Sequence, residues 1–278
     1  MLNEEQSRAQ RVIKVVFLVS VCLLTIYPVL WVFKMAFTPI QGFDMSVNPI
    51  PLHPSLENFR SVLFDRPFFM WLTNSVIVSG ATTLLGVFLA STSAYALSRF
   101  RFPGRSTAML SFLVTQMFPG VLMMIPLFLI MDTLGLLDSL LGLILPYSTT
   151  AIPFCVWMLK GYFDTIPQEL EEAAIMEGAT RAQIFWYIVI PLGLPAIAVT
   201  ALFSFMTAWN EFVLAATFMN KETNYTLPVG LRMMVGQFSS DWGNFAAGAI
   251  LVSLPIVALF FALQRNLVGG LTAGGVKG

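Results

Sequence analysis

The carboxylates that could do chemistry in this chain are concentrated in one short segment. Four of the fifteen acidic side chains gather there: Glu169, Glu171, Glu172 and Glu177. A charge run of this kind is usually a solvated helix face. Its place directly before a long apolar stretch favours a second interpretation, in which it forms a surface that docks onto another molecule.

Other residue types that catalyse reactions or bind metals are scarce. His53 is the only histidine and lies in a proline-rich loop, which excludes zinc chemistry of the HExxH type and any second histidine ligand. Cys22 and Cys155 both lie in apolar runs, where cysteine behaves as a small packing residue. We therefore expect no catalytic residue, no metal site and no cofactor bound by this chain.

A nucleotide-binding loop is absent from the sequence as well. The pattern GxxxxGK[ST], whose backbone amides cradle phosphates, occurs nowhere in the chain. The glycines near the C-terminus lack the Lys-Ser/Thr pair that such a loop needs. ATP must therefore be bound by another polypeptide if this chain takes part in an ATP-driven process.

The composition indicates an all-α integral membrane protein. The chain of 278 residues is 57% hydrophobic and 11% charged, whereas soluble domains carry roughly 25% charged residues. Its mean hydropathy is +0.79, so many apolar side chains must face lipid or other apolar helices. The net charge is zero, which excludes a strongly basic nucleic-acid-binding protein.

Six apolar stretches are long enough to cross a bilayer as helices, which takes about 20 residues. They cover approximately residues 15–33, 69–97, 107–131, 140–159, 189–212 and 244–263. The first stretch is too long for a signal peptide and lacks a cleavage site, so we expect it to be retained. No soluble domain fits between the spans, and we expect one transmembrane domain over residues 1–278.

Lysine and arginine predict which side of the membrane each loop faces, because cytoplasmic loops are enriched in them. If the spans alternate, one side receives Arg8, Arg11, Lys14, Arg99, Arg101, Arg105, Lys160, Arg181, Arg265 and Lys277. The other side receives Lys34, Arg60, Arg66, Lys221 and Arg232. This asymmetry predicts that both termini are cytoplasmic.

Several spans contain proline and glycine, as in "MFPGVLMMIP", "LPYSTTAIPF" and "IPLGLP". One interpretation is ordinary kinking and close packing through small residues. The other is a moving core that lines a substrate path. Glu211 lies at the end of the fifth span, two residues after Trp209, which is typical of a membrane-boundary position. The alternative is that Asn210 and Glu211 line the substrate path.

The acidic segment itself predicts two helices joined by a glycine elbow. Asp164 or Thr165 can cap the first helix, and Gly178 can supply the left-handed residue that ends it. Thr180 followed by Gln183 predicts a capping box at the start of the second helix. The apolar side of the first helix can pack on this chain's own helices or into a groove of a cytoplasmic partner.

The same segment resembles the EAA loop of ABC importer permeases. That signature is EAA, three residues, G, nine residues and I-x-L-P. Here it is matched by Glu172 to Ala174, Gly178 and Ile188 to Pro191, with Ile190 where leucine is usual. The stretches "SAYALSRFRFPGR", "YTLPVGL", "WGNFAAGAI" and the tail "GLTAGGVKG" resemble the carbohydrate permeases of this family, in particular the MalG-like ones.

The resemblance implies a type I ABC importer permease fold with six transmembrane helices and a cytoplasmic coupling helix within residues 164–190. That helix would sit in a groove of an ATPase subunit and transmit its closure to the membrane helices. The implied contact residues are Glu171, Glu172, Ala173, Ala174, Gly178, Ile188 and Pro191. The tail would reach into the ATPase dimer interface, and it is too rich in glycine to fold alone. Its implied contacts are Gly274, Gly275, Val276, Lys277 and Gly278.

The resemblance also implies the partners and the location. They are a second, MalF-like permease subunit, two ABC ATPase subunits that use ATP and Mg²⁺, and an extracytoplasmic sugar-binding protein. The complex would lie in a bacterial-type inner membrane, and this chain would be a transport subunit without enzymatic activity. Maltose or maltodextrin is the expected sugar, and trehalose or another glycoside stays open.

The two alternative classes of function are an ion-coupled secondary transporter and an intramembrane enzyme. An ion-coupled secondary transporter needs charges inside the membrane, and the one acidic residue near a span interior, Glu211, lies close to an edge. An intramembrane enzyme would need a histidine-based site or an aspartate pair within the spans, and the sequence has neither. Both classes fit the sequence less well than an ABC permease.

Overall fold

The computed structural model describes residues 8–39, 48–236 and 241–275. Every regular element in these segments is a helix. The described residues form two compact units. The first contains the segments up to Phe68 and Leu231–Ser253, and the second contains Phe69–Gly230 and the chain from Leu254 onward.

The first unit is built around a long apolar helix near the N-terminus. Its elements are α1 (Arg8–Phe37), α2 (Glu57–Arg60), η1 (Ser61–Asp65) and the first part of α12 (Trp242–Gly275). The side-chain amide of Asn58 closes the C-terminal end of α1, where carbonyl oxygens lack helical partners. Its Nδ2 donates, over 2.9–3.3 Å, to the carbonyl oxygens of Met35, Ala36 and Thr38.

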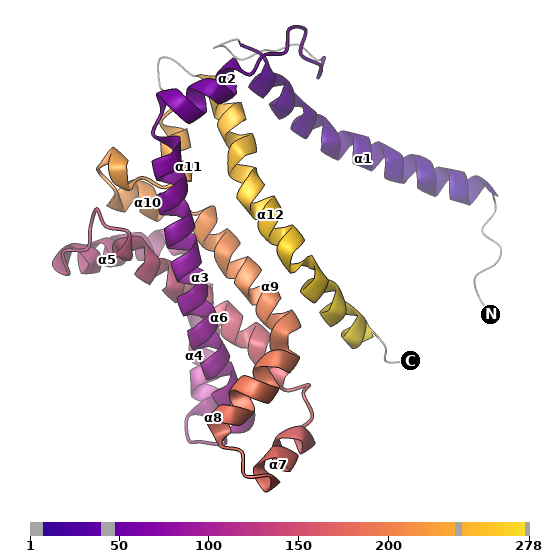
Figure 1. Ribbon diagram of the computed structural model, residues 1–278, viewed down its shortest axis with the longest axis vertical. Helices are drawn as coiled ribbons and strands as arrows, with labels where there is room; N and C mark the ends of the chain where they lie inside the picture. The colour runs from indigo at the N-terminus through magenta and orange to yellow at the C-terminus, as the bar shows by residue number, and fades with distance from the viewer. Residues whose placement is uncertain (1–7, 40–47, 237–240, 276–278) are drawn as a thin grey trace. The chain divides into compact units, whose positions relative to one another are not determined.

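The second unit contains most of the remaining helices. They are α3 (Phe68–Arg99), α4 (Arg105–Met117), α5 (Gly120–Thr133), α6 (Leu141–Phe163), α7 (Glu169–Met176), α8 (Arg181–Ile184), η2 (Phe185–Val189), α9 (Ile190–Trp209), α10 (Val213–Phe218), η3 (Glu222–Asn224) and α11 (Leu227–Arg232). Within this unit α6 and α9 pack along each other, and α7 and α8 lie at the turn between them (Figure 1).

Five of the six predicted spans are single helical segments that are long and apolar enough to cross a membrane. They are Gln10–Phe37, Phe68–Arg99, Leu141–Phe163, Arg181–Trp209 and Trp242–Gln264. The remaining span is formed by α4 and α5 together, which are bent by 101° at the break between them. The described residues therefore hold up to six spans, and the kink that was one interpretation of "MFPGVLMMIP" lies inside the span predicted over residues 107–131.

The break has a local cause at Phe118 and Pro119. Phe118 is extended, with φ −76° and ψ 128°, and Pro119 is extended as well. Proline has no amide hydrogen and disfavours the helical conformation in the residue before it. The motif "MFPG" therefore ends α4, and α5 begins at Gly120.

One core cluster of the second unit lies near α7 and joins α3, α6 and α9. It consists of Ala90, Ala94, Tyr95, Leu97, Cys155, Val156, Leu159, Phe163, Ile166, Ile184, Phe185, Val189 and Ala196. A close approach between α6 and α9 depends on Gly193, because a Cβ there would lie 2.7 Å from the ring of Phe163. Real Cβ contacts are not that short, so a larger residue would force the helices apart.

Hydrogen bonds between loops support the predicted alternation of the spans. The carboxylate of Asp138, in the turn after α5, accepts from the amides of Asn220 and Lys221, both over 3.1 Å. The last turn of α3 meets the end of α6, where Ser98 donates to Asp164 over 2.6 Å. Alternating spans place each of these pairs on one side of a membrane. Which side is cytoplasmic stays a prediction from the charges.

Candidate functional site

The acidic segment forms a short helix, α7, whose start differs from the prediction. The expected caps, Asp164 and Thr165, are wrong, because α7 begins at Glu169 without a side-chain cap. The carboxylate of Asp164 instead accepts hydrogen bonds from Ser98 and Lys160, so it does not cap α7. The hydroxyl of Thr165 donates to a backbone carbonyl in the last turn of α6.

The end of α7 is a Schellman motif, which confirms the predicted glycine elbow. Gly178 has φ +88°, a conformation that costs residues with a Cβ roughly 1–2 kcal/mol. Its amide donates to the carbonyl of Ile175, and the amide of Ala179 donates to the carbonyl of Ala174, both over 2.9 Å. These bonds satisfy carbonyls that the helix end would otherwise leave free.

The start of α8 confirms the predicted capping box. The hydroxyl of Thr180 accepts from the amide of Gln183 over 3.3 Å, and the side-chain oxygen of Gln183 accepts from the amide of Thr180 over 2.8 Å. The two caps hold the elbow between α7 and α8 in one conformation, so the segment is a rigid corner.

A buried ion pair ties α7 to the end of α3. The side chain of Glu171 is 4% exposed and that of Arg99 is 5% exposed, and Nε of Arg99 lies 2.5 Å from Oε1 of Glu171. The hydroxyl of Tyr95 donates to the second carboxylate oxygen over 3.0 Å. Arg99 also donates to the carbonyl of Ile166, just before α7, over 2.9 Å. Glu171 is therefore an internal anchor.

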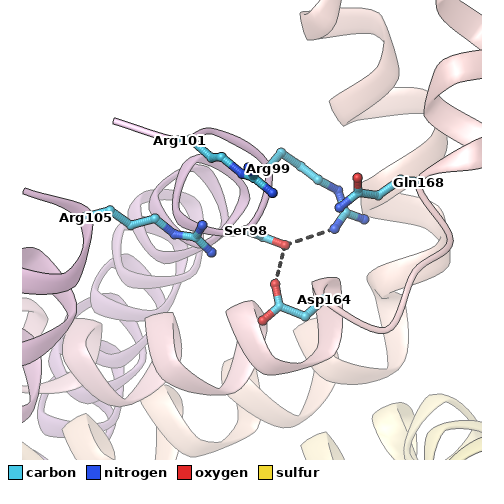
Figure 2. A pocket seen from close by; sticks show the side chains of 6 residues that line it. All are labelled: Ser98, Arg99, Arg101, Arg105, Asp164 and Gln168. Atoms are coloured by element: carbon cyan, nitrogen blue, oxygen red, sulfur yellow. Dashed lines mark hydrogen bonds between the residues drawn. The ribbon is translucent and has the colours of Figure 1, made fainter. Parts of the chain in front are cut away.

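A second set of bonds ties the end of α3 to the end of α6 (Figure 2). Ser98 donates to Asp164 over 2.6 Å and accepts from Arg99 over 3.0 Å. Burial alone would raise the pKa of Asp164, but hydrogen bonds from Lys160 and Ser98 and the charges of Lys160 and Arg105 hold it below its ordinary value. The carboxylate is therefore ionised at neutral pH.

The opposite face of α7 points away from the core. Glu172 and Ala173 are exposed, Ile175 is 40% exposed and Met176 is 88% exposed. Ala174 is half-buried and packs against the core cluster near α7. The outer face of α7, defined by these four exposed residues, thus combines one carboxylate, one small side chain and two large apolar side chains.

The remaining predicted residues of this segment lie on either side of the elbow. Ile188 is half-buried in η2 and packs against the core cluster near α7. Pro191 is exposed in the first turn of α9, where proline is well tolerated. The structure thus brings Glu172 and Ala173 together on an outer face, while Glu171, Ala174 and Ile188 point inward. Arg99 could not be predicted as the partner of Glu171, because the two residues lie 72 positions apart in the sequence.

Glu211 closes the start of α10 and contacts α6. Its carboxylate accepts from the hydroxyl of Tyr147 over 2.5 Å and from the amides of Leu214 and Ala215 over 2.9 and 3.2 Å. Asn210 donates to a carbonyl one turn earlier in α9. These bonds favour the boundary role of Glu211, and a contact of either residue with substrate stays a prediction.

The C-terminal segment is described only in part. The last helix, α12, continues through Gly274 and Gly275, and a contact of these residues with an ATPase subunit stays a prediction. Val276, Lys277 and Gly278 lie outside the described residues.

Comparison with known proteins decides the family. Residues 82–272 match the family described as binding-protein-dependent transport system inner membrane component. The chain belongs to this family. It is therefore a membrane component of such a transport system, which agrees with the five or six apolar spans found among the described residues.

Similar members of this family are named as permeases for different sugars. The chain is 37% identical to a galactooligosaccharides transport system permease of Bacillus subtilis, with 98% of both chains covered. It is 39% identical to the maltose/maltodextrin permease MalG of Vibrio vulnificus, with 92% of both covered. It is 37% identical to a trehalose permease of Mycobacterium tuberculosis, covering 90% of this chain and 92% of that protein.

A solved structure shows the same fold. One chain of a bacterial ABC transporter involved in the import of the acidic polysaccharide alginate superimposes with a TM-score of 0.81 and 25% sequence identity. The match covers 95% of this chain and 99% of that chain. This permease therefore has the predicted type I ABC importer fold.

Proposed function

We propose that this chain is a permease subunit of an ATP-driven sugar importer. Relatives that match nearly the whole chain are named as permeases for three kinds of sugar, which supports a carbohydrate substrate. The chain would form half of the translocation path, and a second, MalF-like permease would form the other half. The family description supports a binding protein that delivers the sugar.

The outer face of α7 is the proposed contact with an ATPase subunit, and this face is the observation that carries the proposal. Exposed large apolar side chains on a short rigid helix are typical of a helix that lies in a partner's groove. Met176 supplies the apolar tip and Glu172 supplies a charge that can pair with a basic residue of the groove. The small side chain of Ala173 would let the backbone of α7 lie close to the surface of the groove.

The contacts on the inner face of α7 would carry the movement of the ATPase into the membrane. Glu171 is bonded to Arg99 at the end of α3, and Ala174 packs against the core shared with α6 and α9. Because the Gly178 elbow is capped on both sides, α7 cannot tilt without moving α8 as well. A displacement of α7 would thus reach three membrane helices at once.

The nucleotide would be bound by the partner. Because the sequence lacks a phosphate-binding loop, two ABC ATPase subunits would bind ATP and Mg²⁺ and hydrolyse the nucleotide. The complex would lie in the inner membrane with α7 and both termini of this chain in the cytoplasm, as the basic residues predict. The C-terminal residues would contact the ATPase dimer.

Maltose or a maltodextrin is the proposed sugar, and trehalose or another glycoside is the alternative. The test is purification of the complex with its binding protein, followed by mass spectrometry of the protein and the sugar, and by ATP-driven uptake in vesicles. We expect two ATPase subunits, one binding protein and a glucose oligosaccharide. A different sugar would overturn the maltose assignment alone, whereas uptake that survives ATP depletion and stops with the ion gradient would overturn the ATP-driven function.

A further inference from the structure

A cavity lined by three arginines lies where the turn between α3 and α4 meets the end of α6. Its volume is about 360 Å³, near the lower end of the range of small-ligand sites. Figure 2 shows its lining side chains, which come from the end of α3, the turn after it, the start of α4, the end of α6 and the start of α7. They are Ser98, Arg99, Arg101, Arg105, Asp164 and Gln168.

The charges of this arginine cavity do not balance. Arg99 is paired with Glu171 and Lys160 is paired with Asp164. Within the described residues, the side chains of Arg101 and Arg105 form neither a salt bridge nor a hydrogen bond, although the charge of Arg105 attracts Asp164 at longer range. The cavity therefore keeps two guanidinium charges for a ligand, which must be an anion.

The position of the cavity points to the membrane surface. Arg99 is the last residue of α3 and Arg105 is the first residue of α4, so the cavity lies where two apolar segments reach the edge of the bilayer. Phe100 and Phe102, beside it, are 40% and 42% exposed. Helix α4 has no fully buried residue. Met109 and Phe112 pack against the core cluster near α7, whereas Leu110, Leu113 and Val114 are 58%, 45% and 42% exposed and are open to acyl chains.

We propose that the arginine cavity binds the phosphate group of an anionic lipid. Guanidinium groups bind phosphate oxygens through two parallel hydrogen bonds, and the cavity offers two guanidinium groups, those of Arg101 and Arg105, that form no salt bridge within the described residues. The lipid's acyl chains would extend along the exposed apolar side of α4. A free phosphate ion or an acidic protein segment would not need this apolar surface, so its presence favours a lipid. Basic pockets at the ends of transmembrane helices suit lipid headgroups for this reason. The proposal is independent of the transported sugar.

The experiment is native mass spectrometry of the full chain, purified in mild detergent with the subunits that it retains. Phosphatidylglycerol, phosphatidylcholine and inorganic phosphate are titrated separately. We expect phosphatidylglycerol adducts on the wild type, and binding weaker by about tenfold or more in the variant Arg101→Gln/Arg105→Gln, since two charge-assisted contacts are lost. Arg66→Gln, which removes a charge before the other end of α3, is expected to bind like the wild type.

A charge-conserving variant separates a loss of lipid binding from a loss of folding, because it changes the same two side chains but keeps their positive charges. Arg101→Lys/Arg105→Lys retains most of the binding if charge is what holds the lipid. The proposal is overturned if phosphatidylcholine binds equally, if the glutamine variant binds like the wild type, or if Arg66→Gln loses as much. Binding of inorganic phosphate alone, or loss of the lipid when the ATPase subunits assemble, would assign the cavity to a free anion or to a protein carboxylate.

Discussion

Glu172→Lys is expected to abolish ATP-driven sugar uptake while the protein remains folded in the membrane. The side chain of Glu172 is exposed on α7, so its reversal changes the stability of this chain by no more than about 0.5 kcal/mol. At an interface with a basic groove the same change would cost about 2–5 kcal/mol. Uptake into vesicles and the thermal unfolding of the purified protein measure the two effects separately.

Glu222→Lys is the matched control. Glu222 is also exposed, and its loop is predicted to face the opposite side of the membrane, so the same charge reversal there is expected to leave coupling to the ATPase intact. Normal uptake by Glu172→Lys at normal expression would contradict the docking of α7. Equal losses from both reversals would indicate an unspecific effect of charge.

Breaking the buried pair between Arg99 and Glu171 is expected to be the most destabilising change in this region. In Glu171→Gln the buried guanidinium keeps its charge without a countercharge, which costs about 3–5 kcal/mol. For a chain of this size we expect a fall of the thermal midpoint by about 6–12 °C. Thermal unfolding in detergent measures the shift, and the coupling of ATP hydrolysis to uptake is expected to fall with it.

Two further variants test the cause of this loss. Glu169→Gln removes an exposed charge from the same helix and is expected to shift the midpoint by about 1–2 °C at most. The double variant Arg99→Met/Glu171→Met removes both charges and is expected to recover part of the stability. A midpoint of Glu171→Gln equal to that of Glu169→Gln would show that the ion pair contributes little.

The spans and the elbow could be predicted from the sequence because their causes are local. About 20 apolar residues in a row, a glycine at the end of α7 and the Thr180–Gln183 pair each determine structure within a few positions. Five predicted spans and both caps are confirmed. The motif "MFPG" favoured a kink in the third span, but the apolar count continued through it, so the size of the bend could not be predicted.

The roles of the glutamates could not be predicted, because they depend on contacts that are distant in the sequence. Adjacent residues of a helix point in different directions, yet the sequence does not say which direction faces the core. Glu171 meets Arg99, which lies 72 positions away, while its neighbour Glu172 is exposed. The start of α7 was misplaced because the carboxylate of Asp164 accepts hydrogen bonds from Ser98, which is distant in the sequence, and from Lys160, one turn earlier.

The most direct measurement of the central claim is site-specific cross-linking from Met176 in the assembled transporter. A photoreactive amino acid at this position, which is 88% exposed on α7, is expected to form a covalent adduct with an ATPase subunit. The same group at Leu52, which is 83% exposed in a loop predicted on the other side of the membrane, is expected to form none. A probe at Met176 that labels the binding protein, or that labels no other subunit of the complex, would contradict the account.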